Sequence, residues 1–372
     1  MPAKKGGSRT TKTPIPIMRP SLPSLEVYTK RLRRIWDSRM LSNFGENTQE
    51  LEMKAQKYLG NTHVRAVSSC DTALILGLAA LKIPRGSECI VTPFTFNSTI
   101  NAIIWNGLRP CFVDIDPLTF NICPDEVEKA ISQQTKAIVA THVFGNPCNI
   151  RELLRIADEH GLHLVFDAAH AYGSLYKGRK IGSLGEVEAF SLSGTKLVTG
   201  GEGGLLATTS AEVVRKIELL RNYGFYGDYN SMYVGLNGKM SELNAALACL
   251  TIDTIEAAVK RRNEIASIYR EELQDLDGLT FQSIDKQSRC AYKDFGVRIR
   301  RKRDQIEKEL SANKIQTKRY FLPAHTMPAY VGFQSASLHE TERLYSEILC
   351  LPIYNEMGDS AVRSVCEAFR KS

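Results

Sequence analysis

Two polar residues stand where apolar, strand-like runs of this chain end. Asp167 closes the run 163–167, and Lys196 follows the run 188–192. Small residues lie around the lysine and would permit close approach of a ligand, namely Ser193, Gly194, Gly200 and Gly201. An amine in such surroundings, with a carboxylate from a neighbouring strand, is the pair that pyridoxal phosphate requires. The lysine forms a Schiff base with the aldehyde, and the carboxylate keeps the ring nitrogen protonated.

That chemistry also needs a phosphate site and a group that stacks on the ring. The segment 68–72, Ser-Ser-Cys-Asp-Thr, precedes the apolar helical segment 73–81, so its backbone N–H groups and the helix dipole favour a phosphate. The segment 93–96, Pro-Phe-Thr-Phe, ends the next strand and could place an aromatic ring over the cofactor. These features together predict a cofactor site.

Each feature alone has an ordinary explanation as well. Asp167 and the turn at 68–72 could be helix caps, Lys196 a solvated surface lysine, and a phenylalanine of 93–96 part of the core. The order of the features at successive strand ends favours a joint site over four separate explanations.

The elements that must position these residues alternate between strands and helices. Six runs of nearly continuous apolar residues are typical of strands buried on both faces: 88–93, 110–114, 137–143, 163–167, 188–192 and 204–208. Helical spacing separates them, as in Ile150, Leu153, Leu154 and Ala157. This alternation predicts an α/β fold with a mainly parallel sheet, whose ligands bind at the C-terminal ends of the strands.

The chain divides into three predicted parts. Residues 1–18 are predicted to be a basic flexible tail, residues 19–245 a large α/β domain, and residues 246–372 a smaller α+β domain. The net charge of +7 is concentrated near the N-terminus, because residues 1–39 hold ten basic and two acidic residues. The rest of the chain therefore lacks the sustained basic face of a nucleic-acid binder.

Several other classes of protein are disfavoured by the sequence. No strand is followed by Gly-x-Gly-x-x-Gly, and no P-loop is present. Nine cysteines without a Cys-x-x-Cys pair, and seven histidines without ligand spacing, argue against a metal site and fit a reducing compartment. With no signal peptide or membrane span recognised, we expect a cytoplasmic protein that does not bind membranes.

A set of motifs follows in a fixed order along nearly the whole chain: 68–74, 92–96, 112–116, 142–145, 167–171, 191–196, 202–204 and 235–242. In this order and spacing the chain resembles the DegT/DnrJ/EryC1/StrS family of pyridoxal-phosphate sugar aminotransferases. The resemblance implies the aspartate aminotransferase (type I) fold, with a large α/β domain and a smaller C-terminal α+β domain. It also implies a homodimer whose active site is shared between the subunits.

The resemblance further implies roles around the cofactor ring. Lys196 would hold the cofactor and move the proton, and Asp167 would pair with the ring nitrogen. Phe96 would stack on the ring, and His170 would lie beside it. Lys196 is retained here, whereas the dehydratase branch of the family has histidine at that position.

The remaining implied roles concern phosphate and substrate. The residues expected to bind the cofactor phosphate are Ser69, Cys70, Asp71, Ser191 and, from the partner subunit, Asn237. Lys239 and His325 would contact the sugar nucleotide. The phosphate turn usually reads Ser-Gly-Thr in the family, so with Cys70 and Asp71 after Ser69 we expect backbone amides to do the binding.

The implied reaction moves an amino group from L-glutamate to a keto-sugar nucleotide. The favoured substrate is dTDP-4-keto-6-deoxy-D-glucose, which gives dTDP-4-amino-4,6-dideoxyglucose. GDP-4-keto-6-deoxymannose, which gives GDP-perosamine, and 3-keto sugars are the alternatives. Such products feed O-antigen (lipopolysaccharide) or antibiotic glycosylation. A non-catalytic regulator on the same fold is a more distant alternative, which Lys196 and Asp167 disfavour.

Overall fold

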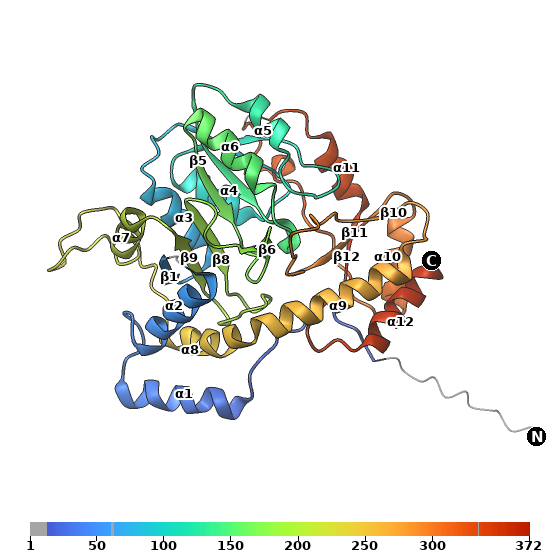
Figure 1. Ribbon diagram of the computed structural model, residues 1–372, viewed down its shortest axis with the longest axis horizontal. Helices are drawn as coiled ribbons and strands as arrows, with labels where there is room; N and C mark the ends of the chain where they lie inside the picture. The colour runs from blue at the N-terminus through green and yellow to red at the C-terminus, as the bar shows by residue number, and fades with distance from the viewer. Residues whose placement is uncertain (1–12, 61–62, 334) are drawn as a thin grey trace, which may run out of the picture.

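The computed structural model describes residues 13–60, 63–333 and 335–372 (Figure 1). The helices are α1 (Leu25–Ser38), α2 (Glu46–Leu59), α3 (Cys70–Ala80), α4 (Asn97–Trp105), α5 (Pro124–Ala130), α6 (Ile150–His160), α7 (Ala211–Leu220), α8 (Glu242–Thr251), α9 (Ile255–Leu273), α10 (Arg303–Ala312), α11 (His339–Glu347) and α12 (Asp359–Arg370). The strands are β1 (His63–Val67), β2 (Glu88–Val91), β3 (Arg109–Phe112), β4 (Thr135–Thr141), β5 (His163–Asp167), β6 (Leu175–Tyr176), β7 (Arg179–Lys180), β8 (Val187–Ser191), β9 (Gly204–Thr208), β10 (Leu279–Phe281), β11 (Phe295–Ile299) and β12 (Ile348–Leu351). Three short 3-10 helices are η1 (Val143–Gly145), η2 (Ile252–Thr254) and η3 (Ala324–Thr326).

A seven-stranded sheet forms the centre of the molecule, in the order β1-β9-β8-β5-β4-β2-β3. Five neighbouring strands, from β8 to β3, run parallel, whereas β9 is antiparallel to both β8 and β1. The predicted mainly parallel sheet is therefore confirmed, and each of the six predicted apolar runs holds one of its strands. The seventh, β1, is not among the predicted strands, because Arg65 interrupts its apolar run.

Both faces of this sheet are covered by helices, which explains the apolar runs. In β4, Ile138 and Ala140 pack with α2, α6 and α8, while Ala137 and Val139 pack with α3, α4 and α7. Successive side chains of a strand point to opposite faces, so a strand with two buried faces needs apolar residues at nearly every position.

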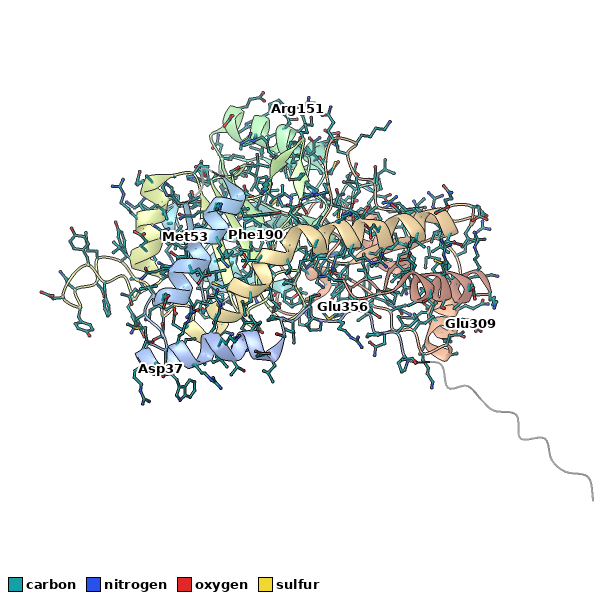
Figure 2. The ribbon with its side chains drawn as sticks, turned by 60° about the horizontal axis from the view of Figure 1, so that its bottom comes forward. Asp37, Met53, Arg151, Phe190, Glu309 and Glu356 are labelled. Atoms are coloured by element: carbon teal, nitrogen blue, oxygen red, sulfur yellow. The ribbon has the colours of Figure 1, made fainter. Side chains whose placement is uncertain are left out.

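A second, three-stranded antiparallel sheet, β10-β11-β12, lies in the C-terminal part of the chain. Helix α9 runs along the molecule between the helices of the large sheet and this part (Figure 2). Ile255 and Val259 of α9 belong to the core of the large sheet, whereas Ile265 and Tyr269 belong to the core of the small one. The predicted boundary after residue 245 falls inside α8, and we propose to place the division within α9 instead.

The N-terminal segment crosses to the C-terminal part before α1 begins. Residues 1–12 of the predicted tail lie outside the described residues. The backbone N–H of Ile15 donates to the Lys314 carbonyl at 3.0 Å, and that of Ile353 donates to the Ile17 carbonyl at 3.1 Å. The chain is thus held at positions that fall inside the predicted tail of residues 1–18. Over the part of the chain that the structure describes, no helix combines the length and apolarity needed to cross a bilayer.

Candidate functional site

A cavity of about 360 Å³ lies at the C-terminal ends of the parallel strands. Eight of the eleven predicted site residues line it: Ser69, Cys70, Asp71, Phe96, Asp167, His170, Ser191 and Lys196. Asp167 and Ser191 are the last residues of β5 and β8, which pair directly in the sheet. The topology therefore brings together residues that are far apart in sequence.

Asp167 is a buried carboxylate, with only 3% of the residue exposed. The Thr99 hydroxyl donates to its Oδ2 at 2.6 Å, and the Ala169 backbone N–H donates to its Oδ1 at 3.0 Å. Burial raises the pKa of Asp167, while these two hydrogen bonds and the Lys196 ammonium oppose that rise. Its oxygens retain lone pairs for a further donor, such as a protonated ring nitrogen.

Lys196 lies in the turn after β8, where its backbone N–H donates to the Ser193 carbonyl at 3.0 Å. The residue is half-buried and lines the cavity. Burial and the positive charge of Lys293 lower the pKa of Lys196 to about 8. A larger fraction of the amine is therefore neutral near physiological pH than for a solvated lysine, and a neutral amine is the form that attacks a carbonyl.

The N-terminus of α3 forms another side of the cavity. Ser69 is its N-cap, and the Ser69 hydroxyl accepts the backbone N–H of Thr72 at 3.0 Å. Strand β9 passes so close that a Cβ on Gly204 would meet the Ser69 carbonyl oxygen at 2.5 Å and the Cys70 nitrogen at 2.8 Å. Gly204 thus allows this helix start to sit against the sheet, and helix N-termini favour anions.

His170 and Phe96 contribute rings to the cavity. The His170 imidazole is stacked with Phe144 and Phe321, at centroid distances of 6.5 and 6.1 Å. Burial, together with the charges of Lys196 and Lys293, holds the pKa of His170 well below its usual range, so the ring is neutral. Its Nδ1 is buried and has no hydrogen-bond partner among the described residues. Phe96 is 60% exposed and lines the cavity at the N-cap of α4, whereas Phe94 is fully buried.

Three predicted residues do not line the cavity within one copy of the chain. Asn237 is exposed and forms a backbone bridge with Asn222. The Lys239 ammonium donates to the Asn222 side-chain oxygen at 3.2 Å and lies over the Tyr223 ring. His325 is in η3, where its Nε2 lies 3.1 Å from Glu342. Their predicted roles therefore depend on a second subunit or on substrate, and stay predictions.

Sequence reasoning missed the wall that the C-terminal part contributes, which consists of Lys293, Lys318, Tyr320 and Phe321. Lys293 is 4% exposed, and its ammonium lies 3.0 Å from both carboxylate oxygens of Asp294. Both Lys293 and Lys318 lie over the Tyr320 ring, at 5.5 and 4.3 Å from its centroid. The signal that could have found this wall is the charged Lys293-Asp294 pair, which directly precedes the buried strand β11.

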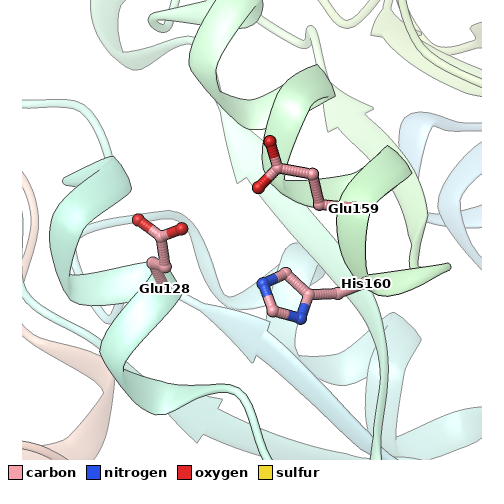
Figure 3. Close-up of side chains that lie close together, drawn as sticks. All are labelled: Glu128, Glu159 and His160. Carbon is pink, nitrogen blue, oxygen red and sulfur yellow. The ribbon is translucent and has the colours of Figure 1, made fainter.

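One cluster with metal-ligating side chains lies elsewhere, on the surface. Glu128, Glu159 and His160 come together between α5 and α6 (Figure 3). The Arg155 guanidinium, however, hydrogen-bonds to both carboxylates, at 2.6 Å to Glu159 and 3.3 Å to Glu128. An arginine already supplies the positive charge that these carboxylates need, so this cluster is explained as a surface ion-pair network.

The residues of the cavity fit pyridoxal phosphate. The buried Asp167 carboxylate can accept from the ring nitrogen, Lys196 can bind the aldehyde carbon, and the N-terminus of α3 with Ser191 can hold the phosphate. The unpartnered Nδ1 of His170 is a buried polar atom that a ligand in the cavity would satisfy. The cavity therefore offers a partner to each polar part of the cofactor, namely the ring nitrogen, the aldehyde and the phosphate.

Known proteins match the chain over nearly its whole length. Residues 25–370 match the DegT/DnrJ/EryC1/StrS aminotransferase family. The chain is 36% identical to dTDP-4-amino-4,6-dideoxy-D-glucose transaminase of Escherichia coli, over 94% of this chain and 96% of the relative. It is 32% identical to GDP-perosamine synthase of Vibrio cholerae, over 96% and 98%. The crystal structure of DesI, determined with its TDP-sugar product, superposes with a TM-score of 0.90 at 36% identity, covering 96% of this chain and 92% of DesI.

Fold and site together define a pyridoxal-phosphate-dependent aminotransferase. The chain belongs to the DegT/DnrJ/EryC1/StrS aminotransferase family. The predicted family, aminotransferase fold, enzyme class and cofactor are thereby confirmed. The comparisons give no support to the alternative of a non-catalytic regulator on the same fold.

Proposed function

We propose that this enzyme transfers the amino group of L-glutamate to dTDP-4-keto-6-deoxy-D-glucose and so makes dTDP-4-amino-4,6-dideoxyglucose. The observation that carries the proposal is the enclosure of the Lys196 amine and the Asp167 carboxylate in one cavity of an aminotransferase fold. The choice of a dTDP-sugar is supported by the 36% identity to the E. coli transaminase and by the 36% identity to DesI, whose crystal structure was determined with its TDP-sugar product.

When bound, pyridoxal phosphate supplies an electron sink that stabilises negative charge on the carbon losing a proton. The chain supplies the groups around it. Asp167 would hold the ring nitrogen in its protonated form, and the N-terminus of α3 would hold the phosphate. The Lys196 Nζ, with its pKa lowered to about 8, takes up and returns the proton within the cavity.

The amino donor is proposed to bind through the C-terminal wall. L-Glutamate carries two carboxylates, and the wall offers ammonium groups at Lys293 and Lys318. Lys293 is paired with Asp294, whereas Lys318 has no carboxylate partner within the described part of the chain. Lys318 is therefore the cation best placed to bind a substrate carboxylate, because binding it breaks no existing ion pair.

The active site is proposed to be shared within a homodimer. The loop 222–237 projects beside α7 (Figure 1), and it exposes large apolar side chains: Tyr226 (64%), Tyr229 (85%), Met232 (57%) and Val234 (101%). Such an exposed apolar loop is typical of a protein contact. Asn237 at its end would then reach the cofactor phosphate of the partner. Light scattering should give twice the chain mass of 41.5 kDa.

The proposal is tested by presenting the purified enzyme with L-glutamate and a panel of keto-sugar nucleotides. We expect formation of dTDP-4-amino-4,6-dideoxyglucose, detected by mass spectrometry and NMR, with the highest kcat/KM in the panel. Amination of GDP-4-keto-6-deoxymannose or a 3-keto sugar at a higher kcat/KM would replace the proposed substrate. Amination of no panel member would overturn the sugar-nucleotide assignment itself.

A further inference from the structure

Three buried threonine hydroxyls connect neighbouring strand ends to Asp167. The Thr99 Oγ1 lies 2.6 Å from Asp167 Oδ2, Thr95 Oγ1 lies 2.9 Å from Thr99 Oγ1, and Thr141 Oγ1 lies 2.8 Å from Thr95 Oγ1. Thr99, Thr95 and Thr141 are 0%, 1% and 4% exposed. Polar groups buried this deeply are costly unless they are hydrogen-bonded, and here each hydroxyl bonds to the next.

The charge of Asp167 sets the direction of this chain of hydroxyls. An ionised carboxylate only accepts, so Thr99 must donate its one hydroxyl proton to Asp167. Thr99 can then only accept from Thr95, and Thr95 can only accept from Thr141. The distance of 2.6 Å from Thr99 to Asp167 lies in the range of a charge-assisted O–H···O⁻ bond.

The sheet holds these four residues in place. Thr141 is the last residue of β4 and pairs in register with Asp167, the last residue of β5, so both side chains point to the same face. Thr95 follows β2, which pairs with β4, and Thr99 lies in the first turn of α4. Threonine is β-branched, which restricts its side-chain rotamers. Three adjacent elements therefore fix the geometry of the hydroxyls before any ligand binds.

We propose that Thr141, Thr95 and Thr99 form a directed hydroxyl relay that keeps Asp167 anionic and oriented for the ring nitrogen of the cofactor. The three threonines are positioning residues, since they act through Asp167. Thr99 does not line the cavity, whereas Thr95 and Thr141 do, so Thr99 gives the cleanest test. The proposal rests on the proposed role of Asp167 and adds the means by which a fully buried carboxylate stays charged. Burial raises the pKa of Asp167, and the Thr99 hydrogen bond opposes that rise.

Replacement of Thr99 by valine tests the relay, because it removes the hydroxyl and keeps the branched shape. Loss of a hydrogen bond to a charged group should weaken pyridoxal phosphate binding by about ten- to a hundredfold. It should also raise the pKa of Asp167 further, because the hydrogen bond that opposes the effect of burial is lost. The pKa is followed through the carboxylate infrared band of the full-length, cofactor-free protein, identified by subtracting the spectrum of Asp167→Asn. In Thr99→Ser, which restores the hydroxyl, both values should return toward those of the wild type.

Thr341 provides a matched control. It is fully buried, and its hydroxyl donates to a carboxylate oxygen of Asp114 at 2.7 Å, but neither residue lines the cavity. Thr341→Val should destabilise the protein to a similar degree as Thr99→Val, as measured by urea unfolding. Its affinity for pyridoxal phosphate and the infrared titration of Asp167 should not change, which separates the relay from a general packing effect.

The outcomes separate the relay from the role of Asp167 itself. If Asp167→Asn weakens cofactor binding and Thr99→Val leaves both the affinity and the Asp167 pKa unchanged, the relay is wrong. If Asp167→Asn binds the cofactor as tightly as the wild type and turns over at the same rate, the role of Asp167 fails first. Thr95→Val and Thr141→Val should give the same two effects at smaller size, and they keep the test decisive if Thr99→Val does not fold.

Discussion

The cavity has two walls that differ in how the chain builds them. The strand-end wall consists of Ser69, Asp167, His170, Ser191 and Lys196, at or just after the ends of helix-covered strands and at the start of α3. The C-terminal wall consists of Lys293, Lys318, Tyr320 and Phe321, from the segment before β11 and the loop after α10. The first wall carries the groups that we propose to react, and the second carries Lys293, whose charge acts on Lys196 and His170.

The difference between the walls suggests a division of tasks. The backbone of Asp167 is fixed by ladder partners on both sides, and Lys196 lies in a turn closed by the hydrogen bond from its N–H to Ser193. Such fixed positions suit a carboxylate and an amine that must hold their geometry. The C-terminal wall instead changes the electrostatics, because the charge of Lys293 contributes to the lowered pKa values of both Lys196 and His170. Substitutions in the two walls should therefore have different signatures.

The largest effect is expected in the strand-end wall, at Lys196. Lys196→Ala removes both the covalent anchor and the group that moves the proton, so turnover should fall by at least about 10²–10⁴-fold. Borohydride should fix the cofactor mass to the wild-type chain and not to the variant, as seen by mass spectrometry. Lys177→Ala, at an exposed lysine, should leave both measurements unchanged. Normal turnover in Lys196→Ala would refute the assignment of the reactive amine.

The next effect concerns the phosphate end of the same wall. Gly204→Ala places a Cβ 2.5 Å from the Ser69 carbonyl oxygen, so the start of α3 must shift. Overpacking of this kind lowers the free energy of unfolding by about 1–3 kcal/mol. The displaced start of α3 should also weaken binding of pyridoxal phosphate by about tenfold, because its N–H groups no longer point at the phosphate. In Gly358→Ala, at the N-cap of α12 and away from the cavity, the nearest atom lies at 4.0 Å, so we expect no comparable loss. Equal affinities of the two variants, measured by equilibrium dialysis, would contradict this role of Gly204.

The same division explains how much of the molecule could be predicted from the sequence. The strands and the strand-end wall leave local signals, because a strand covered on both faces must be apolar and a site at its end must be polar. Asp167 after 163–166 and Lys196 beyond 188–192 are recognisable for that reason.

The C-terminal wall leaves a weaker signal, the charged Lys293-Asp294 pair before β11, and the sequence does not indicate that this pair reaches the cavity. Lys293 and Lys318 meet the cavity only because the C-terminal part packs against the end of the large sheet, as when Phe321 contacts Phe94 and Phe144. This packing joins segments more than a hundred residues apart, and the spacing of residues in one segment does not report it. The converse holds for three residues that the family resemblance points to and that one chain alone does not bring to the cavity: Asn237, Lys239 and His325.

A third prediction tests whether the C-terminal wall controls the charge of the strand-end wall. Lys293→Met removes a positive charge near Lys196 and also leaves Asp294 unpaired, and both changes raise the pKa of Lys196 above about 8. The rate at which cofactor-free enzyme takes up pyridoxal phosphate depends on the neutral amine. The acid limb of its pH profile should therefore move to higher pH.

Charge is separated from shape in that experiment by Lys293→Arg, which should keep the wild-type profile. The double variant Lys293→Met, Asp294→Leu removes the unpaired carboxylate and should give a smaller displacement than Lys293→Met alone. An unchanged profile in Lys293→Met would show that burial alone sets the pKa of Lys196, and the two walls would then be electrostatically independent.

The smallest effect is expected at Lys318, the exposed cation of the C-terminal wall. If Lys318 binds a carboxylate of the donor, Lys318→Met should raise KM for L-glutamate by about tenfold. This is the lower end of the effect expected from losing a hydrogen bond to a charged group, because the site is partly solvated. The affinity of the enzyme for pyridoxal phosphate and KM for the keto-sugar nucleotide should stay the same, since neither depends on that carboxylate.

Lys314→Met, at an exposed lysine on the same segment that does not line the cavity, is the matched control. Binding of 2-oxoglutarate, followed by calorimetry, should weaken in parallel with KM for L-glutamate. An equal rise of both substrates' KM values would instead mean that Lys318 shapes the cavity as a whole, and the donor carboxylate would have to be held elsewhere.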